Sequence, residues 1–119
     1  MIQKNTYLIP ADKCGVWWVS AIHLYGGFFR KVSYTGNFVK ISVKKTRPDN
    51  WLKKKTKLKG ILVRSKKSVY KRDGTSIKFF SNSVVLLKKR TTSQGKVIFG
   101  PTTNNIRRKK FLTSFPGVL

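Results

Sequence analysis

Hydrophobic and polar residues alternate along much of this chain with the period of β-strands. Between Phe38 and Lys45, the apolar residues Val39, Ile41 and Val43 alternate with lysine and serine, as in a strand with one solvent-facing side. Other runs rich in β-branched or aromatic residues are bounded by glycine or by charged residues. The further strands that we expect are Val16–Leu24, Ile61–Arg64, Val84–Leu87 and Gly95–Phe99. Because Val84–Leu87 is apolar throughout, we expect it to be buried on both faces.

Turn signals connect these segments. Asp73–Gly74 lies between Val69–Arg72 and Thr75–Phe79, and an Asp-Gly pair in this setting predicts a β-hairpin, because both residues tolerate positive φ. Short strands with regularly spaced turns are typical of a small closed barrel or a sandwich. The pattern therefore predicts a mainly β protein.

Near the C-terminus the pattern changes. Asn104 or Asn105 is expected to cap a short helix that runs to Lys110, and Pro116 is expected to end a second turn. With no repeat, linker or composition boundary, the 119 residues predict one domain, residues 1–119, with residues 102–119 as a helical tail.

The charge balance indicates that this β domain binds a polyanion. The chain has 27 lysines and arginines against three aspartates and no glutamate, a formal net charge of +24. Mutual repulsion of these charges costs on the order of 5 kcal/mol after physiological screening, against a total stability of about 5–15 kcal/mol for a native domain. Since 39% of the residues are hydrophobic, the chain can still bury a core. Nucleic acid is the polyanion that such a surface most often binds.

Other functional classes lack the residues that they need. Cys14 is the only cysteine, which excludes an internal disulfide and a cysteine-based metal site and favours a reducing compartment. The apolar runs are far shorter than the roughly 20 residues of a membrane span, and the N-terminal residues resemble neither a signal nor a transit peptide. His23 is the only histidine and the three aspartates are scattered, so we expect no catalysis, cofactor or metal; Asp73 reads as a turn residue.

The basic residues are concentrated in the middle of the chain. Trp51–Lys59 carries five lysines between two expected strands, a density suited to neutralising phosphates. Arg64–Lys67 and Lys71–Arg72 lie at the ends of an expected strand and hairpin, where arginine can bind phosphate through two nitrogens. The alternative for each segment is a solvated surface run, and the charge of the whole chain favours phosphate contact. For Trp17–Trp18 and Phe79–Phe80, a core or protein-interface role is favoured over stacking on RNA bases.

Several motifs, in order and with characteristic spacing, resemble one family. They are MIQ at Met1–Gln3, LYGG at Leu24–Gly27, TGNFVKISVK at Thr35–Lys44, VRSKK at Val63–Lys67, RDGTSIKF at Arg72–Phe79 and GKVIFGP at Gly95–Pro101. Together they resemble the universal large-subunit ribosomal protein fourteen family over essentially the whole chain. The chain departs from that family in lacking several acids; Asn37 and Asn105, for example, stand where the family usually has an acidic residue.

The resemblance implies a five-stranded β-barrel with a C-terminal loop and short helices. It also implies a non-catalytic role in the large ribosomal subunit, with large-subunit rRNA, small-subunit rRNA across the subunit interface and neighbouring ribosomal proteins as partners. The candidate rRNA contacts are Arg30, Lys31, Lys44, Lys53, Lys54, Lys55, Arg64, Lys66, Lys67 and Arg72, and the candidate subunit-interface residues are Arg107, Arg108, Lys109 and Lys110.

The composition, with two alanines against many lysines, asparagines and phenylalanines, suggests an AT-rich genome. With the missing transit peptide it favours a mitochondrial ribosome and a protein encoded in the organelle; a bacterial or plastid ribosome is the alternative. Two other functions stay open at this point, a free-standing basic barrel that binds nucleic acid and a nuclease that uses His23.

Overall fold

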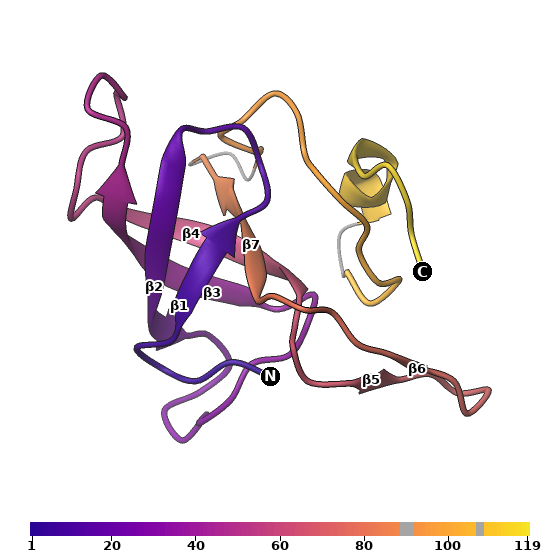
Figure 1. The fold of residues 1–119 in the computed structure, drawn as a ribbon. Coiled ribbons are helices and arrows are strands. Elements are labelled where there is room, and N and C mark those ends of the chain that lie inside the picture. Colours follow the sequence, from indigo (N-terminus) through magenta and orange to yellow (C-terminus); the bar gives the residue numbers. More distant parts are fainter. Residues whose placement is uncertain (89–91, 107–108) are drawn as a thin grey trace.

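Five strands close into a barrel in a computed structural model that describes residues 1–88, 92–106 and 109–119, with only the backbone described for residues 109–111. Neighbouring strands follow the order β1-β2-β3-β4-β7 (Figure 1). Every neighbouring pair is antiparallel except β1 and β7, which pair in parallel and close the barrel. The barrel strands are β1 (Tyr7–Pro10), β2 (Val16–Leu24), β3 (Phe38–Thr46), β4 (Lys57–Arg64) and β7 (Ser83–Leu87).

Alternating side chains fill the barrel interior. Val39, Ile41 and Val43 of β3 are buried there with apolar residues of the other four strands, which confirms the apolar face read from the sequence. On the other face Lys40 and Lys44 are exposed as expected, whereas Ser42 is buried. Each fully buried side chain of this kind contributes about 1.5–3 kcal/mol. The interior is thus a packed core rather than a ligand cavity.

A second apolar layer lies outside the barrel and explains why all five residues of β7 are buried. Val84 and Leu86 point into the barrel, whereas Val85 and Leu87 pack under a separate cluster that includes Ile106 and Phe115 of the C-terminal segment. The prediction that this strand is covered on both faces is confirmed. The C-terminal segment therefore covers the outer face of the barrel at β7 and buries the second apolar cluster.

The two-stranded hairpin predicted around Asp73–Gly74 is present but short. It consists of β5 (Val69–Tyr70) and β6 (Ser76–Ile77) and projects from the barrel at the lower right of Figure 1. Three other expectations differ from the structure. β1 was not expected; β4 begins at Lys57, so the lysine-rich segment is partly strand; and residues 95–99 form only an isolated bridge between Ile98 and Asp12.

The expected helix beginning at Asn104 or Asn105 is also wrong within the described residues. Residues 104 and 105 form a turn, and a short 3-10 helix, η1 (Lys109–Ser114), begins later. Tertiary contacts determine this segment: Ile106 is buried in the second core, and Gly36 lies so close to the carbonyl of Asn105 that a Cβ would collide with it. No helix in the described part of the chain is long and apolar enough to cross a membrane.

Candidate nucleic-acid interface

Most of the candidate rRNA contacts lie on the surface. The exposed ones are Lys31, Lys44, Lys53, Lys54, Lys55, Lys66, Lys67 and Arg72, whereas Arg30 and Arg64 are half-buried. Arg107 and Arg108 lie outside the described residues, as do the side chains of Lys109 and Lys110, whose backbone begins η1. The described residues thus offer a large cationic surface.

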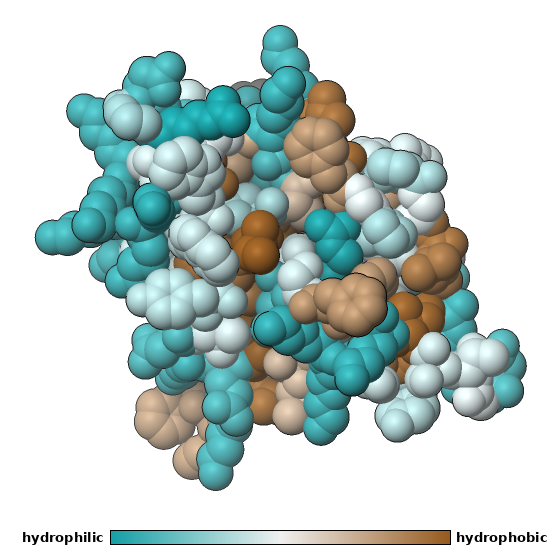
Figure 2. All heavy atoms as spheres, in the orientation of Figure 1, coloured by the Kyte–Doolittle hydropathy of each residue, from teal (hydrophilic) through white to brown (hydrophobic). Residues whose placement is uncertain are grey.

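The exposed cations do not form a single patch. Lys53–Lys55 lie in the connection between β3 and β4, where hydrophilic side chains project from the surface (upper left in Figures 1 and 2). Arg72 lies in the β5–β6 hairpin, which extends from the opposite end of the molecule in Figure 1. The longest principal extent of the molecule is 46 Å. A polyanion that meets both groups must therefore run along the molecule rather than occupy one pocket.

The backbone of the β3–β4 connection is well fixed, so its lysines are displayed on an ordered turn. Lys55 adopts a positive φ of 70° and its N–H donates to the carbonyl of Val43 at 2.8 Å. The Thr56 hydroxyl donates to the carbonyl of Lys53 at 2.7 Å. Further along, Lys59 on β4 holds its Nζ over the rings of Phe38 and Tyr25, 4.4 and 5.3 Å from their centroids. That ammonium is engaged by aromatic faces of the protein itself.

Asp73 acts as a turn residue, as expected. Its Oδ1 accepts hydrogen bonds from the Thr75 hydroxyl at 2.7 Å and the Thr75 N–H at 3.1 Å. These bonds lower the pKa of Asp73, so the carboxylate stays ionised and stabilises the hairpin that carries Arg72.

Arg64 has a structural task that the sequence did not indicate. Its Nη1 donates to the carbonyl of Phe99 at 2.8 Å and to that of Pro101 at 3.1 Å. Gly100, between them, has a φ of 77°, and a Cβ there would collide with the same nitrogen. Arg64 therefore clamps the IFGP segment onto the end of β4, and burial lowers its pKa.

Arg30 is likewise folded back on its own loop. Its Nε donates to the carbonyl of Val32 at 3.0 Å, and its guanidinium packs against Gly26. With the carboxamide oxygen of Asn37 turned toward the arginine, that oxygen accepts from Arg30 Nη2 at 2.6 Å and from the N–H of Tyr34 at 3.0 Å. Asn37 thus remains an acceptor although it carries no charge.

The three aspartates and His23 do not assemble a reactive site. Asp12 is buried, accepts a hydrogen bond from the N–H of Gly95 at 2.9 Å, and so ties the end of β1 to the Gly95–Pro101 segment. Burial raises the pKa of Asp12, and burial next to Asp12 raises the pKa of Cys14 to about 12. Within the described residues, no three His, Cys, Asp or Glu side chains gather as metal ligands. His23 is exposed and contacts the edge of the Tyr25 ring.

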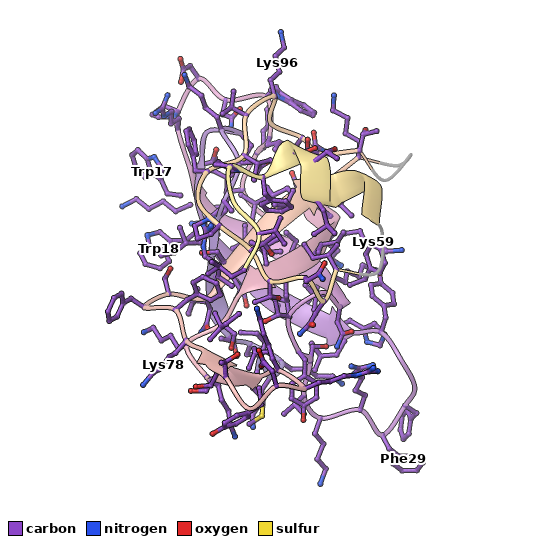
Figure 3. The ribbon with its side chains drawn as sticks, turned by 90° about the vertical axis from the view of Figure 1, so that its right-hand side faces the viewer. Trp17, Trp18, Phe29, Lys59, Lys78 and Lys96 are labelled. Atoms are coloured by element: carbon purple, nitrogen blue, oxygen red, sulfur yellow. The ribbon has the colours of Figure 1, made fainter. Side chains whose placement is uncertain are left out.

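Trp17 and Trp18 both point outward, side by side, away from the barrel (Figure 3). Register shifts on either side of Trp18 in the β2–β3 pairing interrupt the alternation, which is how adjacent residues can share the outer side of a strand. Each is a little under half exposed, and Lys45 Nζ lies 5.1 Å from the ring centroid of Trp17. A core role is therefore wrong for this pair, and a protein interface stays a prediction. Of the other pair, Phe79 is half-buried and Phe80 is fully exposed.

Sequence reasoning missed one exposed feature, the adjacent residues Phe28 and Phe29. They are 90% and 87% exposed at the tip of the connection between β2 and β3. The signal was present in the sequence, since two phenylalanines stand between the turn-forming Gly26–Gly27 and the basic Arg30–Lys31.

Comparison with known proteins agrees with the barrel and with the motifs. Residues 1–115 match the family of ribosomal proteins L14p/L23e. The large ribosomal subunit protein uL14m of Tetrahymena pyriformis, a mitochondrial relative, is 62% identical over 117 residues, which are 98% of each chain. This relative confirms the predicted mitochondrial member of the family, while encoding in the organelle stays a prediction. A whole-chain match of this kind, on a closed five-stranded barrel with a cationic surface, shows that the chain belongs to the L14p/L23e family of large-subunit ribosomal proteins.

Proposed function

We propose that this protein is a structural, non-catalytic component of the mitochondrial large ribosomal subunit that binds large-subunit rRNA and lies at the subunit interface. The observation that carries the proposal is the distribution of charge. Eight of the ten candidate contacts expose their side chains, and they extend over both ends of the molecule. Such a surface suits a folded RNA whose phosphates approach from several helices.

Individual residues have different tasks in this proposal. Lys53–Lys55 neutralise phosphates at one end together with Lys44, whose neighbour Val43 pairs with Lys55. Lys66, Lys67 and Arg72 do so at the hairpin end, and Lys31 does so from the connection between β2 and β3. Arg30 and Arg64 act mainly through the loops that they hold, since their guanidinium groups already donate to backbone carbonyls. Residues 107–110 (Arg-Arg-Lys-Lys) reach the small-subunit rRNA and help to form an intersubunit bridge.

Co-sedimentation tests the assignment. Mitochondrial lysate that contains an epitope-tagged chain is run on sucrose gradients at low salt and at high salt. We expect the tagged chain in the large-subunit peak under both conditions, because an assembled component is held by many contacts at once. A chain that leaves the subunit peak at high salt and binds RNA only at low salt would instead be a free-standing nucleic-acid-binding barrel, the alternative for which Phe28 and Phe29 supply an exposed aromatic surface.

A further inference from the structure

The β2–β3 connection presents two phenylalanines where a soluble protein normally places polar residues. The Arg30 N–H donates to the carbonyl of Gly27 at 3.3 Å, so Phe28 and Phe29 are the central residues of a four-residue turn. Gly, Pro, Asn, Asp and Ser dominate such positions. Burying a phenylalanine side chain stabilises a structure by about 1.5–3 kcal/mol, and neither ring gains this within the chain. Folding therefore does not account for two phenylalanines at these positions, whereas binding to a partner does.

Backbone geometry and Arg30 define the turn that carries the two rings. Gly26 and Gly27 both adopt a φ of 122°, a conformation that favours glycine, and the Arg30 guanidinium packs over Gly26 while its Nε bonds to Val32. The two rings meet edge to face, with centroids 5.2 Å apart and an interplanar angle of 81°. Figure 3 shows Phe29 at the tip of the loop, directed away from the barrel. A pre-ordered turn loses little entropy when a partner binds.

The surroundings of the rings indicate the chemistry of the partner. Phe28 and Phe29 line a cavity of about 440 Å³ together with Gln3, Lys4, Arg30 and Lys31. Three of these six residues are cationic and none is acidic. Aromatic faces flanked by cations match unpaired RNA, whose bases stack on rings while its phosphates meet ammonium groups. A protein partner would have to place acids opposite Lys4 and Lys31 as well as an apolar side chain on the rings.

We propose that Phe28 and Phe29 stack on unpaired bases of the large-subunit rRNA, with Lys4 and Lys31 on the flanking phosphates. Because the rings are nearly perpendicular, their faces cannot both stack in one continuous column of bases. The turn therefore binds nucleotides that leave the helical stack, as in a bulge or a sharply turned loop. This inference rests on the proposed rRNA binding and assigns it an aromatic component.

Salt dependence separates stacking from phosphate contact. The full chain is titrated with a transcript of the large-subunit rRNA of its own mitochondrion over a series of KCl concentrations. We expect Phe28→Ala with Phe29→Ala to lower affinity about tenfold or more at every salt concentration, since stacking is worth ~1–3 kcal/mol per base. The slope of log affinity against log salt stays that of the wild type, because stacking releases no counterions. The melting temperature stays unchanged, because both side chains are exposed.

Three further variants make the test specific. The double Tyr variant at Phe28 and Phe29 retains binding to within about threefold, because tyrosine stacks as well, whereas the double Leu variant does not. Phe80→Ala is the matched control, an exposed phenylalanine outside this cavity, and it leaves affinity unchanged.

The outcomes distinguish this inference from the proposed function. If the wild type binds with a steep salt slope and the double Ala variant binds equally well, or the double Leu variant fully restores binding, the stacking inference is wrong and the proposed function stands. If the double Ala variant binds rRNA normally but fails to enter large subunits, the rings contact a protein neighbour and the inference is also overturned. A wild type that does not bind this rRNA overturns both.

Discussion

Replacing Arg64 distinguishes a structural arginine from a phosphate-binding one. Arg64→Ala removes the two hydrogen bonds from Nη1 to the carbonyls of Phe99 and Pro101. A hydrogen bond from a charged donor contributes about 1.5–3 kcal/mol, with the lower end appropriate for a half-exposed pair. We therefore expect the free energy of unfolding to fall by about 2–3 kcal/mol. For a chain of this size, that corresponds to a melting temperature lower by roughly 8–12 °C.

Thermal and urea unfolding of the purified protein measure this loss, and Lys66→Ala is the matched control. Lys66 is exposed two residues further along the chain, and its replacement changes stability by less than about 0.5 kcal/mol. In RNA binding the order is reversed, and Lys66→Ala has the larger effect on the salt slope. Lys66→Ala reduces the salt slope by about one unit, because one phosphate contact is lost, whereas Arg64→Ala leaves the slope near that of the wild type.

Gly100 extends the test to a double-mutant cycle. Gly100→Ala introduces a Cβ at a φ of 77° and into contact with Arg64 Nη1. In the wild-type background this change costs about 1–2 kcal/mol of backbone strain and also displaces the guanidinium. In the Arg64→Ala background only the strain remains, so we expect a coupling energy of about 1 kcal/mol or more. Additive costs, or an Arg64→Ala variant of native stability with a smaller salt slope, would refute the clamp.

Three other changes test separate parts of the structure. Replacing Lys53, Lys54 and Lys55 together by alanine makes the salt slope about 2–3 units shallower in filter binding, at roughly −0.7 to −0.9 per phosphate contact. An unchanged slope removes this connection from the RNA footprint. Burial raises the pKa of Asp12, so folding favours the protonated carboxyl, and this contribution to stability is lost as pH rises from the ordinary pKa through the raised one. Asp12→Asn keeps an acceptor for the Gly95 N–H and should lose less stability than the wild type as pH rises above about 4 in urea unfolding, whereas parallel profiles would contradict this. With the pKa of Cys14 raised to about 12, iodoacetamide should alkylate the native thiol about a thousandfold more slowly than the unfolded one, as followed by mass spectrometry; equal rates would show an accessible thiolate.

The barrel could be predicted from the sequence because its signals are local. Alternation in β3, the apolar run of β7 and the Asp73–Gly74 turn each follow from a few neighbouring residues. β1 has only 4 residues and ends at Pro10, so it is too short to show an alternating pattern of apolar and polar residues in the sequence. The C-terminal segment was misread because tertiary contacts, namely burial of Ile106 and the close approach to Gly36, outweigh the helix-capping tendency of asparagine.

The candidate site was predicted less completely, for a physical reason. Charge along a sequence shows how many cations exist but not where their side chains point, so the hydrogen bonds from Arg30 and Arg64 to backbone carbonyls could not be predicted. The bulge that turns Trp17 and Trp18 outward cannot be read from alternation, because it breaks alternation. Exposure of Phe28 and Phe29 likewise depends on the three-dimensional path of the loop.

The salt dependence of binding to the mitochondrial large-subunit rRNA tests the central claim most directly. If about eight lysines and arginines neutralise phosphates, log affinity falls against log salt with a slope of about −6 to −7. We expect this slope for the wild-type chain. A slope shallower than about −2 would contradict it, because a barrel with a net charge of +24 would then bind this RNA through something other than its cations.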